Sequence, residues 1–283
     1  MSAPAVSNVS AHNDLPFTYR FVHWWRKRGL AIYSILGIAY LLTPVAWIAL
    51  FSFNKPKGRQ NTSWNQFSLE AWTNICRDET ICSSVKVSFS IGILITVIAV
   101  IMGTLITYAI VRQRFLGRAS TELLIFLPMA TPEVIMGSAL LTLFLNMLLP
   151  LGFWTITIAH IMFTISFIVI VVKARLGSMD PRLEQAAQDL YATPPQAFRF
   201  VTLPILLPGI LAAALLGFSL SFDDFIITNF VNGTTVTFSM YIWGAAQRGI
   251  PPQVNVIATL MFVLSLGLVA VGALVARLRR KTD

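Results

Sequence analysis

Long runs of apolar residues dominate the sequence, and short polar segments separate them. A helix needs about 20 predominantly apolar residues to cross a bilayer. We therefore predict a first transmembrane helix over residues 29–53 and further spans near 85–111, 121–149, 153–172, 205–231 and 254–276. The pattern predicts an all-α membrane protein with six transmembrane helices, organised as a tail (1–28), a first helix (29–53), an external loop (54–84), a transmembrane domain (85–277) and a second tail (278–283).

The first and third runs carry additional signals. The first is too long to be the short apolar core of a cleaved signal peptide, so we expect it to be retained as a helix. Pro128 and Pro132 interrupt the third run. Because proline removes a helical hydrogen bond, the third span is predicted to be kinked or partly unwound, and to face protein or a cavity rather than lipid.

The longest polar interruption lies at residues 182–210, between two strongly apolar runs. Asp180 can cap a helix there, and Pro181 suits its first turn. Small apolar residues then recur at helical spacing, at Leu183, Ala186, Ala187 and Leu190. A second start signal follows at Thr193 and Pro194, before the next apolar run. Two short helices joined by a turn are typical of a docking segment rather than a catalytic site.

Composition and charge also indicate a membrane protein. Of the 283 residues, 56% are hydrophobic and 12% are charged, and the formal net charge is +9. Most of the 21 Lys and Arg residues fall in segments 1–28, 112–118, 173–199 and 277–281. Because cytoplasmic loops carry such an excess, both termini and the 182–210 segment are predicted to lie in the cytoplasm. Membrane topology thus accounts for the basic charge and argues against nucleic acid as a partner.

The 182–210 segment also resembles the EAA loop, by which the permeases of ABC importers engage their ATPase. The resemblance is carried by Ala186, Ala187, Asp189, Leu190, Ala192, Phe198, Val201, Leu203, Pro204, Pro208 and Gly209. It implies a cytoplasmic EAA coupling helix. The ATPase-coupling residues that it assigns are Glu184, Gln185, Ala186, Ala187, Asp189, Leu190 and Tyr191.

Two positions depart from the pattern of that family. Gln185 stands where the family usually carries Glu, and the nearest acid is Glu184, one position earlier. Tyr191 stands where the family usually carries Gly. If that residue ends the helix in a left-handed conformation, a Tyr there costs on the order of 1 kcal/mol. We therefore expect the turn to be built differently in this chain.

Acidic residues within or at the edges of the apolar runs are Glu122, Glu133, Asp223 and Asp224. A carboxylate at the bilayer centre costs roughly 2.5–3.5 kcal/mol, so such residues usually face a polar cavity or a partner. Glu122 is expected to form an ion pair with Arg118, four residues earlier. Glu133 directly follows Pro132 and is assigned to the solute pathway or its gate. The alternative for Glu133 is a structural hydrogen bond to unwound backbone.

The most informative stretch is SFDDF at 221–225, where two adjacent carboxylates stand between aromatic rings. Neighbouring residues of a helix point about 100° apart, so one acid can hold helices together while the other faces a cavity. An acidic, aromatic-lined opening attracts organic cations, and a flexible diamine satisfies both features. The alternative is an aspartate that only caps a break or pairs with a neighbouring subunit. The candidate pathway residues are Glu133, Phe222, Asp223, Asp224, Phe225 and Trp243.

Three stretches are similar to the permeases of spermidine/putrescine-type ABC importers: LPMATPEVIMGSALL, SFDDFIITNFVNG and TFSMYIWGAAQRGIPPQVNVIATL. With the EAA pattern, the similarity covers about residues 85–277. It implies a six-helix type I importer permease fold in the bacterial cytoplasmic (inner) membrane, surrounded by lipid and paired with a second, homologous permease. It also implies two ATP-binding cassette ATPases, which hold ATP and Mg, and an external polyamine-binding protein that docks on outer loops including 232–252. No cofactor is expected on this chain.

Other chemistry has little support in the sequence. It contains no GxxxxGK phosphate loop, GxSxG elbow or HExxH motif, so no catalytic or metal-binding residue is assigned. His160 stands alone in the fourth run, where a packed or hydrogen-bonded histidine is favoured over a proton relay. Cys76 and Cys82 are compatible with a disulfide and with two thiols.

The alternative functions are a permease for another small solute, a channel or ion-gradient-driven transporter, and an intramembrane enzyme built on the acidic residues.

Overall fold

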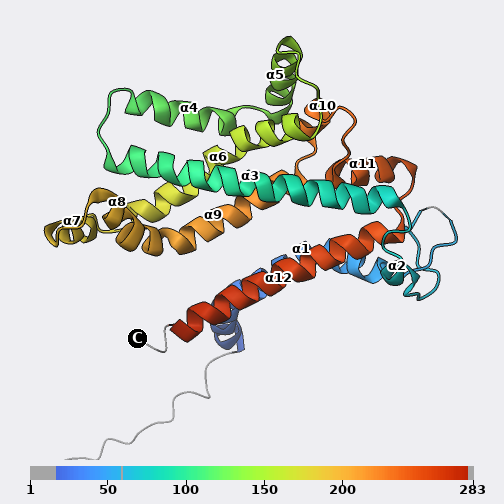
Figure 1. Ribbon diagram of the computed structural model, residues 1–283. Helices are drawn as coiled ribbons and strands as arrows, with labels where there is room; N and C mark the ends of the chain where they lie inside the picture. The colour runs from blue at the N-terminus through green and yellow to red at the C-terminus, as the bar shows by residue number, and fades with distance from the viewer. Residues whose placement is uncertain (1–16, 59, 280–283) are drawn as a thin grey trace, which may run out of the picture. The chain divides into compact units, whose positions relative to one another are not determined.

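The computed structural model describes residues 17–58 and 60–279 (Figure 1). These residues are mostly helical, and an isolated antiparallel bridge joins Asn54 and Phe67. By their internal contacts they divide into two compact units. Unit 1 lies within residues 1–57, 61–73 and 255–283, and unit 2 lies within residues 58–60 and 74–254.

Four helices are long and apolar enough to cross a membrane: α1 (Phe17–Phe51), α3 (Glu79–Arg112), α6 (Phe153–Gly177) and a continuous helix over Pro194–Asp223. The bent pair α4 (Arg118–Ala130) and α5 (Glu133–Asn146) makes a fifth if it crosses as one span. α12 covers Pro252–Arg279 and contains the predicted span 254–276. Within the described part of the chain the structure thus has four or five spans by length and composition, and the number six stays a prediction.

The predicted terminal tails are partly helical. α1 begins at Phe17, inside the predicted tail 1–28, and residues 1–16 of that tail lie outside the described residues. α12 reaches Arg279, and the rest of the predicted tail 278–283 lies outside them as well. Helix at both ends therefore continues beyond the apolar runs from which the spans were predicted.

The predicted external loop 54–84 also contains helix. α2 covers Glu70–Thr73, and α3 begins at Glu79. The carboxylate of Asp78 accepts a hydrogen bond from the backbone N–H of Thr80 at 2.9 Å and caps the first turn of α3. That turn is polar, so hydropathy alone places the start of the helix too late, whereas the capping residue marks it.

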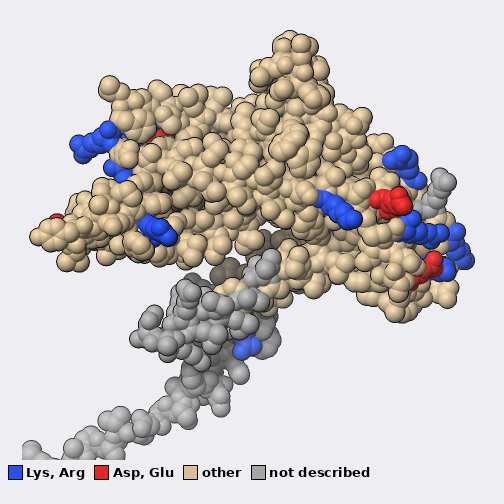
Figure 2. Space-filling view, viewed as in Figure 1, with Lys and Arg blue, Asp and Glu red and all other residues tan. Residues whose placement is uncertain are grey.

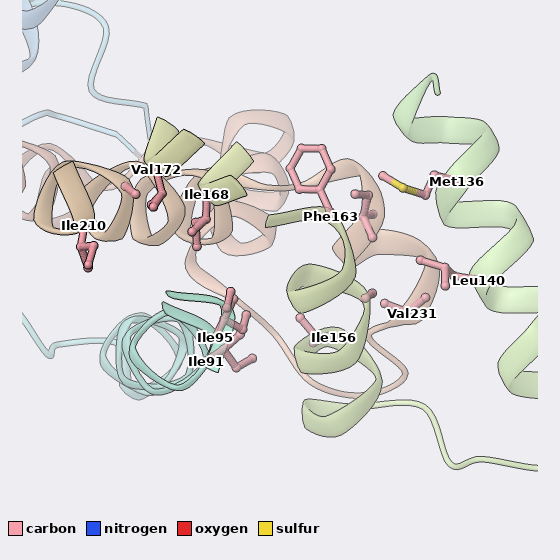
Figure 3. Packing of buried hydrophobic residues seen from close by; sticks show 14 of the residues in the cluster. Ile91, Ile95, Met136, Leu140, Ile156, Phe163, Ile168, Val172, Ile210 and Val231 are labelled. Atoms are coloured by element: carbon pink, nitrogen blue, oxygen red, sulfur yellow. The ribbon is translucent and has the colours of Figure 1, made fainter. Parts of the chain in front are cut away.

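The core of unit 2 is built by α3, α6 and α9 (Leu203–Asp223), which pack against one another along much of their length. Figure 3 shows Ile91 and Ile95 of α3 near Ile156 of α6. Close approach of these helices depends on glycine: a Cβ atom at Gly103 would lie 2.7 Å from Cγ2 of Ile168. Small residues at a helix crossing let two backbones approach in this way.

The third apolar run is broken, as its prolines predict. α4 and α5 meet at an angle of 108°, and the break falls at Thr131 and Pro132, whereas Pro128 remains inside α4. Thr131 and Pro132 have extended ψ values of 131° and 132°, which end the helical turn. Beyond the break α5 packs mainly against α10 (Ile226–Val231), while α4 packs against α6.

Charged side chains lie toward the two ends of the long helices of unit 2, with a broad uncharged surface between them in the view of Figure 2. At one end Glu122 forms ion pairs with Arg118 (3.3 Å) and Lys173 (3.2 Å). This confirms the predicted pair with Arg118 and adds a link from α4 to the end of α6. Arg118 and Lys173, two of the basic residues that the sequence assigns to the cytoplasm, thus meet at a common end of the unit.

In unit 1 the segment after α1 is held by buried polar and aromatic contacts. The amide nitrogen of Asn54 donates to Oδ1 of Asn61 at 2.6 Å, and the amide nitrogen of Asn61 donates to the carbonyl of Phe51 at 2.8 Å. The ring of Phe53 stacks on the rings of Phe67 (5.8 Å) and Trp72 (5.1 Å). The predicted loop is therefore an ordered structure of its own.

Candidate functional site

The first candidate site is the coupling segment, residues 182–204, at one end of unit 2 (Figure 1). α7 covers Arg182–Asp189, and Oδ1 of Asp180 accepts a hydrogen bond from the backbone N–H of Arg182 at 2.9 Å. This confirms the predicted start of a short helix at Asp180 and Pro181. Because α7 lies between α6 and α9, it is carried by the ends of two core helices.

A second short helix leads from α7 into α9. α8 covers Pro194–Ala197, and its start is stabilised by Gln196, whose Oε1 accepts hydrogen bonds from the backbone N–H and the hydroxyl of Thr193. A π-helical turn, η1 (Phe198–Thr202), then continues directly into α9 at Leu203. The predicted second start signal is confirmed, and the coupling segment is joined to α9 without an intervening loop.

The turn after α7 has the geometry that glycine usually supplies. Tyr191 has φ 64°, its N–H donates to the carbonyl of Gln188, and the N–H of Ala192 donates to the carbonyl of Ala187. These two bonds close a helix end of the Schellman type. The expectation of a differently built turn was therefore wrong. The side chain of Tyr191 is 97% exposed, so the strain of the left-handed backbone is not increased by crowding of the ring.

Glu184 points into the protein rather than toward solvent. Its Oε1 lies 3.2 Å from Nε of Arg112 on α3 and accepts a hydrogen bond from the hydroxyl of Thr202 on η1 at 2.8 Å. The side chains of Glu184 and Arg112 are only 10% and 15% exposed. Gln185, which stands at the position of the family's acid, is exposed. The ion pair of this segment is therefore internal and is made one position earlier.

The coupling segment also exposes apolar side chains on the outside of unit 2, among exposed polar residues of α7. Leu183 and Leu190 are 46% and 81% exposed, and Phe200 on η1 is 69% exposed. Ala186 and Asp189 are also exposed, whereas Ala187 is half-buried. A group of exposed apolar side chains at one end of a folded unit is typical of a surface that another protein covers.

The second candidate site is the acidic break, Asp223 to Phe225, which divides the predicted span 205–231. α9 ends at Asp223, Asp224 is extended (φ −63°, ψ 120°), and α10 begins after Phe225. The carbonyl of Asp224, which the break removes from the helical ladder, accepts a hydrogen bond from the hydroxyl of Ser239 at 2.8 Å. The broken backbone is thus satisfied by α11 (Phe238–Arg248).

The two acids at the break have different surroundings. Asp224 has 6% of its side chain exposed, and its Oδ2 is bonded to His160 and Thr228. Asp223 is exposed. The sequence predicted that one acid could hold helices together, and Asp224 does so by joining α9 and α10 to α6. The structure also confirms that His160 is a hydrogen-bonded histidine, with 1% of its side chain exposed.

The aromatic residues beside the acids belong to two groups. Phe222 packs in a ring cluster with Phe89 of α3, at 5.3 Å between ring centroids. Phe225 packs instead against Trp243 of α11, at 4.9 Å and an angle of 30°. Trp243 is 55% exposed. The pair of Phe225 and Trp243 is therefore the aromatic surface next to the break, and Phe222 contributes mainly to packing.

The predicted pathway residues come from several elements of unit 2. Glu133 is exposed and begins α5 directly after the Pro132 break, on a different element from Asp223. Within the described ranges 17–58 and 60–279, no group of three or more His, Cys, Asp or Glu side chains is arranged to hold a metal ion.

Sequence reasoning missed the way in which α11 is held. The segment 232–252 was expected as an outer loop, but it contains α11. The hydroxyl of Tyr241 donates to Oδ2 of Asp78 at 3.0 Å, and the backbone N–H of Phe238 donates to the hydroxyl of Ser88 at 2.8 Å. Burial raises the pKa of Tyr241 to about 12, and the Asp78 carboxylate adds to this shift. Thr237 before a run of apolar and aromatic residues was an available start signal.

The start of α3, to which α11 is tied, is closed by a disulfide. Cys76 and Cys82 are bonded to each other, with their Cα atoms 5.4 Å apart, and the loop between them contains Asp78. The N–H of Thr80, which donates to Asp78, lowers the pKa of this carboxyl below its ordinary value of 3.8. The sequence had left a disulfide and two free thiols as alternatives, and the structure has the disulfide.

Comparisons with known proteins agree with this architecture. Residues 95–283 match the family described as "Binding-protein-dependent transport system inner membrane component". The spermidine/putrescine transport system permease protein PotC of Haemophilus influenzae is 33% identical over 240 residues, covering 84% of this chain and 93% of PotC. The putrescine transport system permease protein PotI of Escherichia coli K12 is 34% identical over 236 residues, covering 80% of this chain and 83% of PotI.

Solved structures share the fold. A bacterial ABC transporter involved in the import of the acidic polysaccharide alginate superimposes with a TM-score of 0.64 at 17% identity, covering 89% of this chain and 96% of that chain. The MetNI methionine ABC transporter superimposes with a TM-score of 0.52 at 18% identity, covering 69% of this chain and 91% of that chain. The predicted fold, that of type I ABC importer permeases, is confirmed. This chain is thus a permease subunit rather than an enzyme, and it belongs to the family of binding-protein-dependent transport system inner membrane components.

Proposed function

We propose that this chain is the permease subunit through which an ATP-driven importer moves polyamines such as putrescine and spermidine across the bacterial cytoplasmic membrane. Relatives that are 31–34% identical over most of its length are named as polyamine permeases. The single observation on the chain that carries the proposal is the exposed carboxylate of Asp223 at the acidic break, beside the aromatic pair of Phe225 and Trp243.

This arrangement suits an organic diamine. A protonated diamine carries an ammonium group at each end of a methylene stem, so it needs both a counter-charge and an apolar contact surface. The carboxylate of Asp223 supplies the first, and the half-exposed ring of Trp243, packed against Phe225, supplies the second through cation–π and apolar contact. A solute without positive charge gains little from either group.

The energy for transport comes from partner subunits. Two ATP-binding cassette ATPases, with Mg and ATP bound to them, dock on the apolar face of the coupling segment, where Leu183 and Leu190 are exposed. Movement of α7 passes to α3 through Arg112 and to α9 through Thr202, because both residues contact Glu184. A second, homologous permease completes the pathway, and rigid-body movement of the helices opens it alternately to each side.

The orientation follows from the charge distribution. Both termini and the coupling segment lie in the cytoplasm, on the side to which most of the basic residues are assigned. The opposite end of unit 2 then faces outward, and it carries the disulfide of Cys76 and Cys82 and helix α11. An extracytoplasmic polyamine-binding protein docks on this outer end and delivers the solute close to the acidic break.

The test is uptake of radiolabelled putrescine by the full complex, reconstituted in proteoliposomes with its binding protein. We expect uptake that requires ATP hydrolysis and is competed by spermidine, but not by neutral or anionic solutes of similar length. Competition by neutral or anionic solutes at equal potency would assign the chain to another solute. Uptake without the ATPases or without nucleotide would instead support a channel or an ion-gradient-driven transporter.

The coupling role has its own test in Ala187→Lys, which places a long charged side chain on the docking face of α7. We expect this variant to hydrolyse ATP without transport, or to lose the ATPase during purification. The matched control is Gln188→Lys, which adds the same charge at the adjacent exposed position. Wild-type uptake and full ATPase recovery in Ala187→Lys contradict the assignment of this face.

A further inference from the structure

Asp224 belongs to a buried polar cluster that the transport mechanism described above does not use. We propose that His160 is a positioning residue of the solute pathway: together with Ser221, Asp224 and Thr228 it fixes the break between α9 and α10, and it leaves Asp223 as the acid that meets the cationic solute. These four residues form the His160 cluster. The inference rests on the proposed function for the nature of the solute, but the geometry of the cluster is independent of it.

The cluster joins three elements through a single carboxylate oxygen. Oδ2 of Asp224 lies 3.1 Å from Nε2 of His160 on α6. The same oxygen accepts hydrogen bonds from the backbone N–H of Thr228 at 2.8 Å and from its hydroxyl at 2.9 Å. Thr228 belongs to α10, and Asp224 directly follows α9. The carboxylate therefore ties the end of α9 and the start of α10 to the first half of α6.

The ring of His160 is held on both sides. Nε2 faces two oxygen atoms, on Asp224 and on Thr228 at 3.0 Å, and we therefore assign the proton to Nε2. Nδ1 lies 3.1 Å from the hydroxyl of Ser221, on the last turns of α9. With 1% of its side chain exposed, the imidazole cannot rotate without breaking these contacts. His160 thus fixes the positions of α9 and α10, on either side of the break, relative to α6.

This arrangement separates the roles of the two adjacent acids. Asp224 already has three donors on Oδ2 and keeps 6% of its side chain exposed, so a solute ammonium group would have to displace bonds inside the protein to reach it. Removing one partner from such a network leaves a buried charge unsatisfied. Asp223 is exposed and is directed by the backbone that Asp224 holds. The cluster consequently sets the direction of Asp223 and of Phe225 on the other side of the break.

The chain offers a matched pair of substitutions at His160. The side-chain amide nitrogen of glutamine reaches about as far as Nε2 of histidine, whereas that of asparagine reaches only about as far as Nδ1. His160→Gln therefore keeps a donor for Asp224, and His160→Asn keeps only the side that faces Ser221. If His160 only filled space, His160→Gln and His160→Asn would have similar effects. Normal labelling and uptake with glutamine but not with asparagine would therefore identify the bond to Asp224.

The direction of Asp223 is measured directly with Asp223→Cys in the full complex. Since the two cysteines of this chain are bonded to each other, the introduced thiol is the one that a cationic, membrane-impermeant methanethiosulfonate meets on this subunit. We expect equal labelling rates with His160 and with His160→Gln, and a change of about threefold or more with His160→Asn. This measurement needs no transported solute, so it stands even if the proposed polyamine function fails.

Uptake of putrescine supplies the second readout, with recovery of the assembled complex measured for each variant. We expect His160→Asn to lower the maximal uptake rate about tenfold at normal recovery, and His160→Gln to restore most of it. The milder Thr228→Val removes one donor to Asp224 and should lower uptake by a few fold. The inference is overturned if the labelling rate is the same in all three backgrounds. It is also overturned if glutamine and asparagine have equal effects on labelling and uptake.

Discussion

The buried ion pair between Glu184 and Arg112 should decide whether movement of α7 reaches the rest of the permease. Glu184→Gln preserves the shape of the side chain and an oxygen that accepts the hydrogen bond from Thr202, but it removes the charge that Arg112 faces at 3.2 Å. Nη2 of Arg112 is already buried without a hydrogen-bond partner. The substitution therefore leaves a largely buried guanidinium with no anion beside it.

The magnitude follows from the burial of the pair. At an effective dielectric of about 20, unit charges about 4 Å apart attract by about 4 kcal/mol, and desolvation offsets part of this. Removing one partner from a fully buried pair costs about 3–5 kcal/mol. Since the Glu184 and Arg112 side chains keep 10% and 15% of their area exposed, we expect about 2–3 kcal/mol. That energy shifts the equilibrium between the attached and detached positions of α7 roughly 30- to 150-fold.

The assay is the ratio of ATP hydrolysed to putrescine imported by the full complex in proteoliposomes. We expect Glu184→Gln to keep ATP hydrolysis and to raise this ratio at least tenfold, because α7 moves with the ATPase and no longer carries α3. Arg112→Gln should have a similar effect, and the double variant should be no worse than either single one. The control is Arg118→Gln, which breaks an exposed, solvent-screened ion pair and should leave this ratio unchanged.

Two results would refute this reasoning. If Glu184→Gln and Arg112→Gln lose transport additively, the two residues act separately and the ion pair is not the link. If both variants import putrescine at the wild-type ratio, α7 transmits its movement through other contacts, such as those of η1 with α9.

Three further predictions concern stability, measured by thermal unfolding of the purified complex for the first two and of the purified chain for the third. The lowered pKa of Asp78 means that its stabilising effect is present above the ordinary value of 3.8 and is lost as the pH falls through the lowered value, so Asp78→Asn should flatten the loss of stability below about pH 4. Gly103→Leu should destabilise the complex by about 1–3 kcal/mol, because its Cβ meets Ile168 at 2.7 Å, whereas Gly37→Leu, with open space around it, should not. Tyr191→Gly should stabilise the isolated chain by about 1 kcal/mol, because glycine adopts φ 64° without strain.

The helical fold could be predicted because its signals are local. Apolar runs long enough to span a bilayer, the break at Pro132 and the capping residues Asp180 and Thr193 each act within one or two turns. The predicted helix boundaries were wrong where polar residues belong to a helix, as in the first turn of α3 after Asp78. Hydropathy measures the free energy of transferring side chains to lipid. It therefore does not predict how far a helix continues beyond the apolar region.

The arrangement of the site was harder to predict because its contacts are distant in sequence. Glu184 meets Arg112 over a separation of 72 residues, and His160 meets Asp224 over a separation of 64. Nothing in a single sequence distinguishes Asp223 from Asp224, because two adjacent acids have the same composition and hydropathy. Their difference arises at the break, where an extended residue turns one carboxylate inward and leaves the other exposed.

The two sites are connected by one helix, and this connection explains why both use internal polar bonds. α9 has 21 residues and is about 30 Å long, and it runs from the coupling segment to the acidic break. At its start Thr202 holds Glu184, and at its end Ser221 and Asp224 hold His160. A packed helix changes length very little, so a displacement at the first end must either move the second end or break one of these bonds. Since both ends are bonded to buried side chains, α9 can carry a movement of α7 to Asp223, the residue that we propose meets the solute.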